Sequence, residues 1–143
     1  MFDTILGLPV HALIVHGVVV LLPLMALVTV VVALRQPWRE RLAWPVVVLN
    51  ALVLGMTFVA KESGEALERR LGVNVSEHES WGSRLPYVAT ALLVVSVVVA
   101  IWRRNSRFGP IAIALTIIAG GLTVFWTVRT GHTGALAVWG SVG

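Results

Sequence analysis

Four long stretches of the chain contain no Asp, Glu, Lys or Arg. They hold 31, 19, 18 and 21 residues, together 89 of 143, and cover residues 4–34, 42–60, 85–102 and 108–128. A helix needs roughly 18–20 apolar residues to cross the hydrocarbon core of a bilayer, so each stretch can span it. Too little chain remains for a separate soluble domain. The pattern therefore predicts an all-α membrane protein, a four-helix bundle in a single domain of residues 1–143.

Prolines and a capping motif mark the expected helix ends. Pro9 suits the first position of a helix, because its missing N–H is not needed there. Ser76 and Glu79 have the form of a capping box, so the third helix can start outside the apolar core. The second and third helices then extend past the same membrane surface. The expected helices are 9–35, 42–71, 77–102 and 110–129, the last continuing in its longer form to 134.

Small residues at four-residue steps indicate where helices approach one another. The second helix carries Ala51 and Gly55, and the fourth carries Ala112, Thr116 and Gly120. Such residues let the backbones of membrane helices pack closely. Ordinary helix packing explains them, although a flat cofactor would need the same gaps.

The composition agrees with a membrane location. Hydrophobic residues make up 57% of the chain and charged residues 13%, whereas a soluble domain has about 45–50% and about 25%. The absence of cysteine excludes disulfides, thiolate metal sites and covalently attached haem. The net charge of +4 is typical of basic cytoplasmic loops, so we expect no nucleic-acid partner.

Basic residues divide unequally between the two ends of the predicted bundle. The short loops at one end carry six Arg and one Glu, whereas the other end carries five Lys or Arg and six acids. Basic loops of membrane proteins stay in the cytoplasm. We therefore predict cytoplasmic short loops, with both termini outside. The six inner arginines are Arg35, Arg39, Arg41, Arg103, Arg104 and Arg107.

The four histidines, His11, His16, His78 and His132, all fall at the outer end of this topology. Ionisable side chains at membrane depth are costly and by default indicate a functional site. His11 and His16 lie on one helix about 140° apart and roughly 7.5 Å along it, so they cannot easily bind the same side of one ion. Simpler roles stay open for each histidine. His11 could lie at the membrane interface and contact lipid headgroups, and His16 could be buried and bonded to a carbonyl. His78 and His132 could simply be solvated.

Residues 7–16 contain two histidines in a pattern that resembles a known family. They are similar to the start of the domain of unknown function 2231 family of bacterial membrane proteins, which reads His-Pro-x-x-Val-His. This chain keeps both histidines, but Ala12 replaces a common proline and residues 17–18 are Gly-Val where Phe-Pro is common. Three later segments also resemble the family: 63–68, 78–82 and 131–135. The resemblance implies a multi-pass four-helix domain in the bacterial inner membrane, related to bundled b-type cytochromes.

A haem b site is the first functional hypothesis. Two imidazoles on different helices must face opposite sides of a slot to bind haem as axial ligands. We predict His16 and His132 as this pair, with His11 and His78 as a second pair or as supporting residues. Other residues expected at the site are Gly17, which leaves room for a flat ring, and the cations Arg129, Arg84 and Lys61, which could bind propionates.

A zinc, iron or copper ion is the second hypothesis, because His and carboxylate together suit these metals. Its candidate ligands are His11, His16, His78, His132 and Glu65, with Glu62, Glu77 and Glu79 nearby in the sequence. A cofactor-free structural subunit of a larger membrane complex is the third hypothesis. Short loops and a minimal extramembrane part fit it equally well.

The haem hypothesis predicts an electron relay or a subunit of a membrane redox complex. A single haem near the outer face cannot carry electrons across a core about 30 Å thick. The expected partners are therefore the lipid bilayer and a membrane redox complex or periplasmic electron-transfer partner, with a homo-oligomer as a further candidate. No hydrolase or phosphate-binding motif indicates a stand-alone enzyme.

Overall fold

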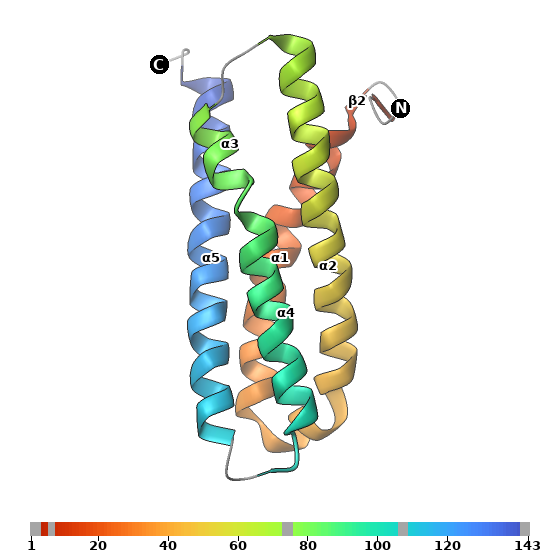
Figure 1. Ribbon diagram of the computed structural model, residues 1–143, viewed down its shortest axis with the longest axis vertical. Coiled ribbons are helices and arrows are strands. Elements are labelled where there is room, and N and C mark those ends of the chain that lie inside the picture. Colours follow the sequence, from red (N-terminus) through yellow and green to blue (C-terminus); the bar gives the residue numbers. More distant parts are fainter. Residues whose placement is uncertain (1–3, 6–7, 73–75, 106–108, 141–143) are drawn as a thin grey trace.

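A computed structural model describes residues 4–5, 8–72, 76–105 and 109–140. A two-residue antiparallel pair of strands precedes five helices (Figure 1). In chain order the elements are β1 (Thr4–Ile5), β2 (Leu8–Pro9), α1 (Val10–Leu34), α2 (Gln36–Leu71), α3 (Ser76–Gly82), α4 (Leu85–Ile101) and α5 (Gly109–Trp139). Four segments in this part of the chain are long and apolar enough to cross a membrane: Val10–Leu34, Gln36–Arg70, Ser76–Ile101 and Gly109–Ala137. The predicted four-helix membrane bundle is confirmed.

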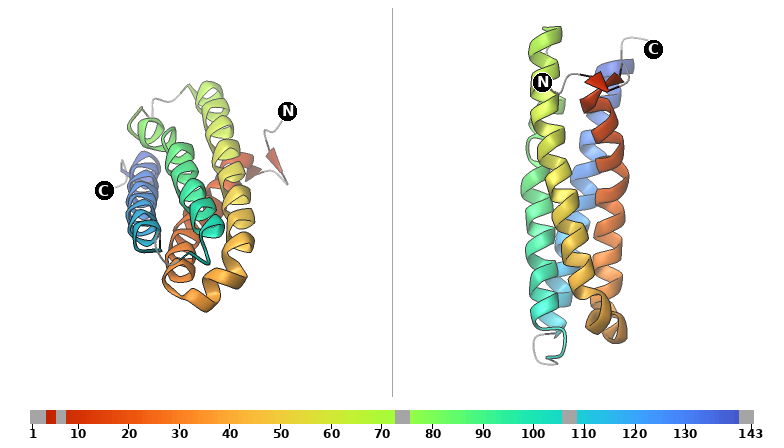
Figure 2. Two further views of the ribbon diagram at one scale, coloured as in Figure 1. Left: turned by 60° about the horizontal axis from the view of Figure 1, so that its bottom comes forward. Right: turned by 90° about the vertical axis from the view of Figure 1, so that its right-hand side faces the viewer.

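The four long helices form a ring in which each contacts two neighbours. Helix α1 packs against α2 and α5, and α4 packs against the same two helices (Figure 2, oblique view on the left). Helices α1 and α4 are therefore diagonal partners, as are α2 and α5. Helix α3 lies at the same corner of the bundle as α4, beyond its start, and packs mainly on α5.

The β strands, the end of α2, helix α3 and the end of α5 lie at one end of the bundle (Figures 1 and 2). We name it the outer end, after the predicted orientation, and the opposite end the inner end. Helix α2 ends where predicted, because Gly72 adopts the left-handed conformation at φ 62° and its N–H bonds to the Glu68 carbonyl. Glycine takes this conformation without steric cost.

Two predicted connections were wrong, and proline explains both. Only Arg35 separates α1 from α2, so residues 36–41 are helical and not a loop. Pro37 favours this early start, because it suits the first turn of a helix. The predicted continuous helix 77–102 is broken between α3 and α4. Pro86 in the first turn of α4 lacks the N–H that would continue a helix from α3.

The interior of the bundle consists of a large apolar cluster and a smaller apolar cluster at the inner end. Helix α5 contributes mostly small side chains to this interior, including the buried Ala112, Thr116 and Gly120. A Cβ on Gly120 would lie 3.0 Å from Val30 Cγ2, so α1 and α5 approach closely there. The predicted contacts of Ala51 and Gly55 were wrong, because both residues are exposed on the side of the bundle.

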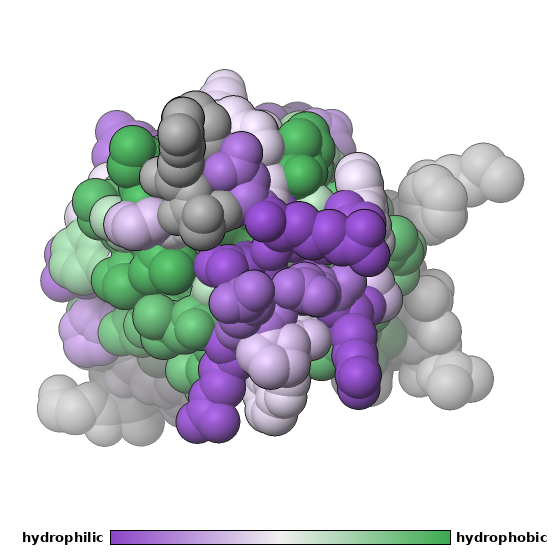
Figure 3. All heavy atoms as spheres, turned by 90° about the horizontal axis from the view of Figure 1, so that it is seen from below, coloured by the Kyte–Doolittle hydropathy of each residue, from purple (hydrophilic) through white to green (hydrophobic). Residues whose placement is uncertain are grey.

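Arginines close the inner end, where Figure 3 shows a hydrophilic patch. Arg39 donates to the Ala33 carbonyl at 3.2 Å and to the Arg103 carbonyl at 3.3 Å. Arg103 in turn donates to the Ala100 carbonyl at 2.8 Å. Cations near helix C-termini offset the partial negative charge of unpaired carbonyls. The structure thus gathers the basic residues that were predicted for the cytoplasmic loops at one end of the bundle. Arg107, the last of them, lies outside the described residues.

Candidate functional site

His11 and His78 meet at the outer end of the bundle. Their ring centres are 6.4 Å apart and their planes make an angle of 77°. His11 lies in the first turn of α1, and His78 lies in α3. The pair therefore joins two diagonal corners of the bundle, between α2 and α5.

Each of these histidines is anchored to a neighbouring helix by its Nδ1 atom. Nδ1 of His11 donates to the carbonyl of Ala60 on α2 at 3.0 Å, and Nδ1 of His78 donates to the carbonyl of Thr130 on α5 at 3.1 Å. A carbonyl oxygen can only accept a hydrogen bond, so each Nδ1 carries the proton. Nε2 of each neutral ring then keeps a lone pair that can bind a metal.

A glycine lies against each anchored ring. A Cβ on Gly64, four residues after Ala60, would stand 2.8 Å from Cε1 of His11. A Cβ on Gly134, four residues after Thr130, would stand 3.0 Å from Cε1 of His78. Real Cβ atoms essentially never approach as closely as at Gly64 and rarely as closely as at Gly134, so a side chain at either position requires the ring to shift. The same arrangement thus occurs on α2 and on α5.

A cation stands next in sequence to each of the two anchoring residues. Lys61 is next to Ala60 in the sequence and forms an ion pair with Glu65 at 2.7 Å. Arg129 precedes Thr130 and lies 5.0 Å from the centre of the Trp81 ring, with Glu77 at 4.0 Å. These pairs are partly exposed and contribute little to stability. They nevertheless keep positive charge beside the two anchoring carbonyls.

The structure does not bring the predicted first pair, His16 and His132, together. Both side chains are exposed, and Nδ1 of His16 bonds to the carbonyl of Ala12 on its own helix. Gly17 does not open a slot either, because a Cβ there would lie 2.7 Å from Cε of Met56. The pairing of His16 with His132 and the room at Gly17 therefore stay predictions, without support from these positions.

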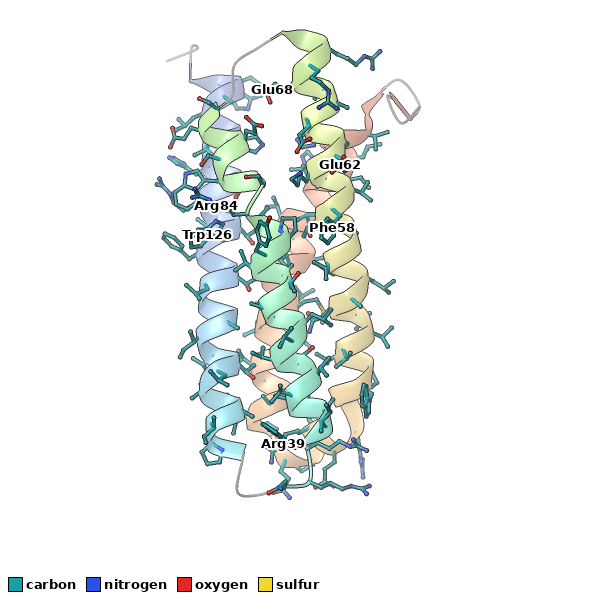
Figure 4. All side chains as sticks on the ribbon, in the orientation of Figure 1. Arg39, Phe58, Glu62, Glu68, Arg84 and Trp126 are labelled. Atoms are coloured by element: carbon teal, nitrogen blue, oxygen red, sulfur yellow. The ribbon has the colours of Figure 1, made fainter. Side chains whose placement is uncertain are left out.

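Arg84 lies apart from the histidine pair, at the junction of α3 and α4. It is exposed and lines a shallow groove with Tyr87, Val88, Leu122 and Trp126. In Figure 4, Arg84 lies beside this junction and Trp126 lies slightly lower on α5. A propionate-binding role for Arg84 therefore stays a prediction, without support from its position.

The carboxylates do not complete a metal site with the histidines. No three His, Cys, Asp or Glu side chains in the described parts of the chain gather as they would around a metal ion. Glu65 lies between Lys61 and Arg69, at 2.7 Å and 3.8 Å. Glu62 lies on the outer part of α2 with its side chain exposed (Figure 4). The site thus offers two imidazole ligands.

The family model described as "predicted membrane protein (DUF2231)" matches residues 7–142. No curated protein and no solved structure matches the chain. The matched range includes both anchored histidines and all four membrane-spanning segments. The chain therefore belongs to the DUF2231 family of predicted membrane proteins.

Proposed function

We propose that this membrane protein binds one haem b through His11 and His78 and passes electrons at its outer end. The observation that carries the proposal is the anchored histidine pair on two diagonal corners of the bundle. Bis-histidine haem needs two imidazoles from different helices, each free at one nitrogen. Hydrogen bonds from the other nitrogen to carbonyls fix the tautomer and orientation of such ligands.

The distance between the rings supports ligands on opposite sides of one metal. A metal–imidazole bond is about 2.0–2.1 Å and the ring centre lies about 1.1 Å behind the nitrogen, which gives about 6.3 Å between opposed rings. A tetrahedral angle at the metal would bring the ring centres to about 5 Å. The 6.4 Å between the two ring centres is compatible with the opposed arrangement.

The number of ligands favours haem over a bare ion. A zinc ion in a protein usually takes at least three protein ligands, and the described residues provide no such group. Two axial imidazoles are sufficient for haem, because the porphyrin supplies four nitrogens itself. His11 and His78 would hold the iron, and Lys61 and Arg129, which are adjacent in sequence to the two anchoring residues, would bind the propionates.

The role that fits this site is an electron relay. Haem supplies one-electron chemistry when bound, while the chain orients the two imidazoles and surrounds them with helices. A centre at the outer end leaves most of a hydrocarbon core about 30 Å thick uncrossed. The partner is therefore a periplasmic electron carrier or a redox subunit that reaches the outer end.

An absorption spectrum of detergent-purified protein, oxidised and reduced, tests the proposal. We expect a b-type spectrum, with one haem per chain by pyridine haemochrome. The nearly perpendicular rings should give the strongly anisotropic low-spin EPR signal of crossed axial imidazoles. His11→Ala or His78→Ala should abolish the bis-histidine spectrum.

His16→Ala and His132→Ala are the matched controls, because both side chains are exposed and apart from the pair. They should keep the wild-type spectrum. If they lose the haem while His11→Ala and His78→Ala retain it, the assignment of the pair is wrong. Protein that takes up no haem when haem is abundant would overturn the electron-relay proposal and leave a metal-binding or structural role.

A further inference from the structure

Each of the four long helices places one polar side chain in the interior of the inner half. Thr29, Asn50, Ser96 and Thr116 have exposed fractions of 2%, 3%, 2% and 0%. Polar side chains inside membrane bundles need hydrogen-bond partners, because no lipid group can supply them.

These four side chains lie at one level of the bundle. Ala33, Ala100 and Ala112 belong to one buried cluster at the inner end, and Val47 packs against it. Thr29, Ser96 and Thr116 each stand four residues from one of these alanines, and Asn50 stands three residues after Val47. Three or four residues make one helical turn. The four therefore form the next layer, which we name the polar layer.

One atom of the polar layer lacks a partner. Asn50 Nδ2 donates to Thr29 Oγ1 at 3.0 Å, and Thr29 Oγ1 donates to the Met25 carbonyl at 2.6 Å. Asn50 Oδ1 is buried and accepts a hydrogen bond from no described group. A buried polar atom without a partner destabilises the fold, so Oδ1 requires a donor.

The other members of the polar layer cannot be that donor. Ser96 donates its hydroxyl hydrogen to the Leu93 carbonyl, and Thr116 donates its own to the Ala112 carbonyl, both at 2.7 Å. Each hydroxyl has only one hydrogen but also two lone pairs. The layer thus holds acceptors on α2, α4 and α5 and needs a donor between them.

A cation is a poor candidate for this position. The charged residues described nearest along the chain to the layer are all arginines: Arg35, Arg41 and Arg103. Glu40, the acidic residue described at the inner end, is exposed and bonds to Gln36. Positive charge without a buried carboxylate disfavours a metal ion in a low-dielectric interior.

We propose that the polar layer binds one water molecule, which donates to Asn50 Oδ1 and to the hydroxyl of Ser96 or Thr116. Buried waters typically make about three hydrogen bonds to otherwise unpaired groups. This water links the α1–α2 pair to the α4–α5 pair across the inner half. The site is independent of the histidine pair and of any haem.

A crystal structure at a resolution that shows ordered water tests this proposal directly. We expect a density peak at about 2.7–3.2 Å from Asn50 Oδ1, and its loss in Asn50→Leu. The matched control is Thr123→Val, which removes a buried hydroxyl that bonds to Ala119 on its own helix. An interior without this peak in the wild-type protein overturns the proposal, whether or not Asn50→Leu folds.

Water relaxation dispersion and thermal unfolding in different salts distinguish water from an ion. Asn50→Leu should lose one long-lived internal water relative to Thr123→Val. Unfolding temperatures in sodium, lithium, potassium and choline chloride at equal ionic strength should agree. A saturable rise in unfolding temperature with one cation alone would show that this ion, and not water, occupies the polar layer. That result would contradict the proposal.

Discussion

At the scale of single residues, the two histidines of the candidate site are held in the same way. Each Nδ1–H donates to a carbonyl on a neighbouring helix, and each ring lies against the glycine one turn further along that helix. The carbonyl fixes the tautomer and the direction of the ring. Gly64 and Gly134 allow the ring to approach the backbone, which is a separate and testable contribution.

A methyl group at position 134 should disturb the pair. In Gly134→Ala the new Cβ would lie 3.0 Å from Cε1 of His78, so the ring must move away from α5. We expect haem affinity to fall about tenfold, or about 1.4 kcal/mol, in a haem titration of the apoprotein. Gly131→Ala is the matched control, because its Cβ would meet nothing within 4 Å. Equal affinity in both variants would show that Gly134 has no such role.

The sequence identified all four histidines but favoured His16 and His132, whereas the structure brings His11 and His78 together. Val18, Leu22 and Met25 are buried on α1, and His11 stands 7, 11 and 14 residues before them, close to whole helical turns. His16 falls between these positions and faces outward. A membrane helix that is apolar all round does not reveal its buried face from sequence. Which face of α1 points into the bundle became clear only from the packing of the helices.

At the scale of helices, apolar length predicted the membrane spans, and proline decided the ends that differed. Helices α2 and α5 continue past their apolar stretches, as expected. The break between α3 and α4 was missed, because a capping box marks where a helix begins and does not show whether it continues. That break matters for the site, since α3 carries His78 and packs on α5.

Pro86→Ala should test the link between this break and the site. Alanine restores the N–H and removes the clash that disfavours a continuous helix, so α3 and α4 can merge. His78 would then leave the Thr130 carbonyl, and we expect most of the haem to be lost while helical content by circular dichroism stays equal or rises. Pro45→Ala, inside α2, is the control and should retain haem. A wild-type haem spectrum in Pro86→Ala would mean that the break does not position His78.

At the scale of the whole molecule, the two ends differ in charge and in chemistry. The inner end carries arginines bonded to helix C-terminal carbonyls, and the polar layer lies one turn inside it. The outer end carries the histidine pair together with the acids of α2 and α3. The side of the membrane that each end faces therefore decides which electron partners could reach the proposed haem.

Cysteine labelling of intact cells should show the outer end on the periplasmic side. The chain has no cysteine, so Ser80→Cys in α3 and Gln36→Cys at the start of α2 each introduce a single thiol at an exposed position. Arginines at the inner end are expected to hold that end in the cytoplasm, because moving basic residues across the bilayer is disfavoured. We expect an impermeant thiol reagent to label Ser80→Cys at once and Gln36→Cys only after the cells are permeabilised. The reverse pattern would place the histidine pair on the cytoplasmic side, and its electron partner would then be a cytoplasmic one.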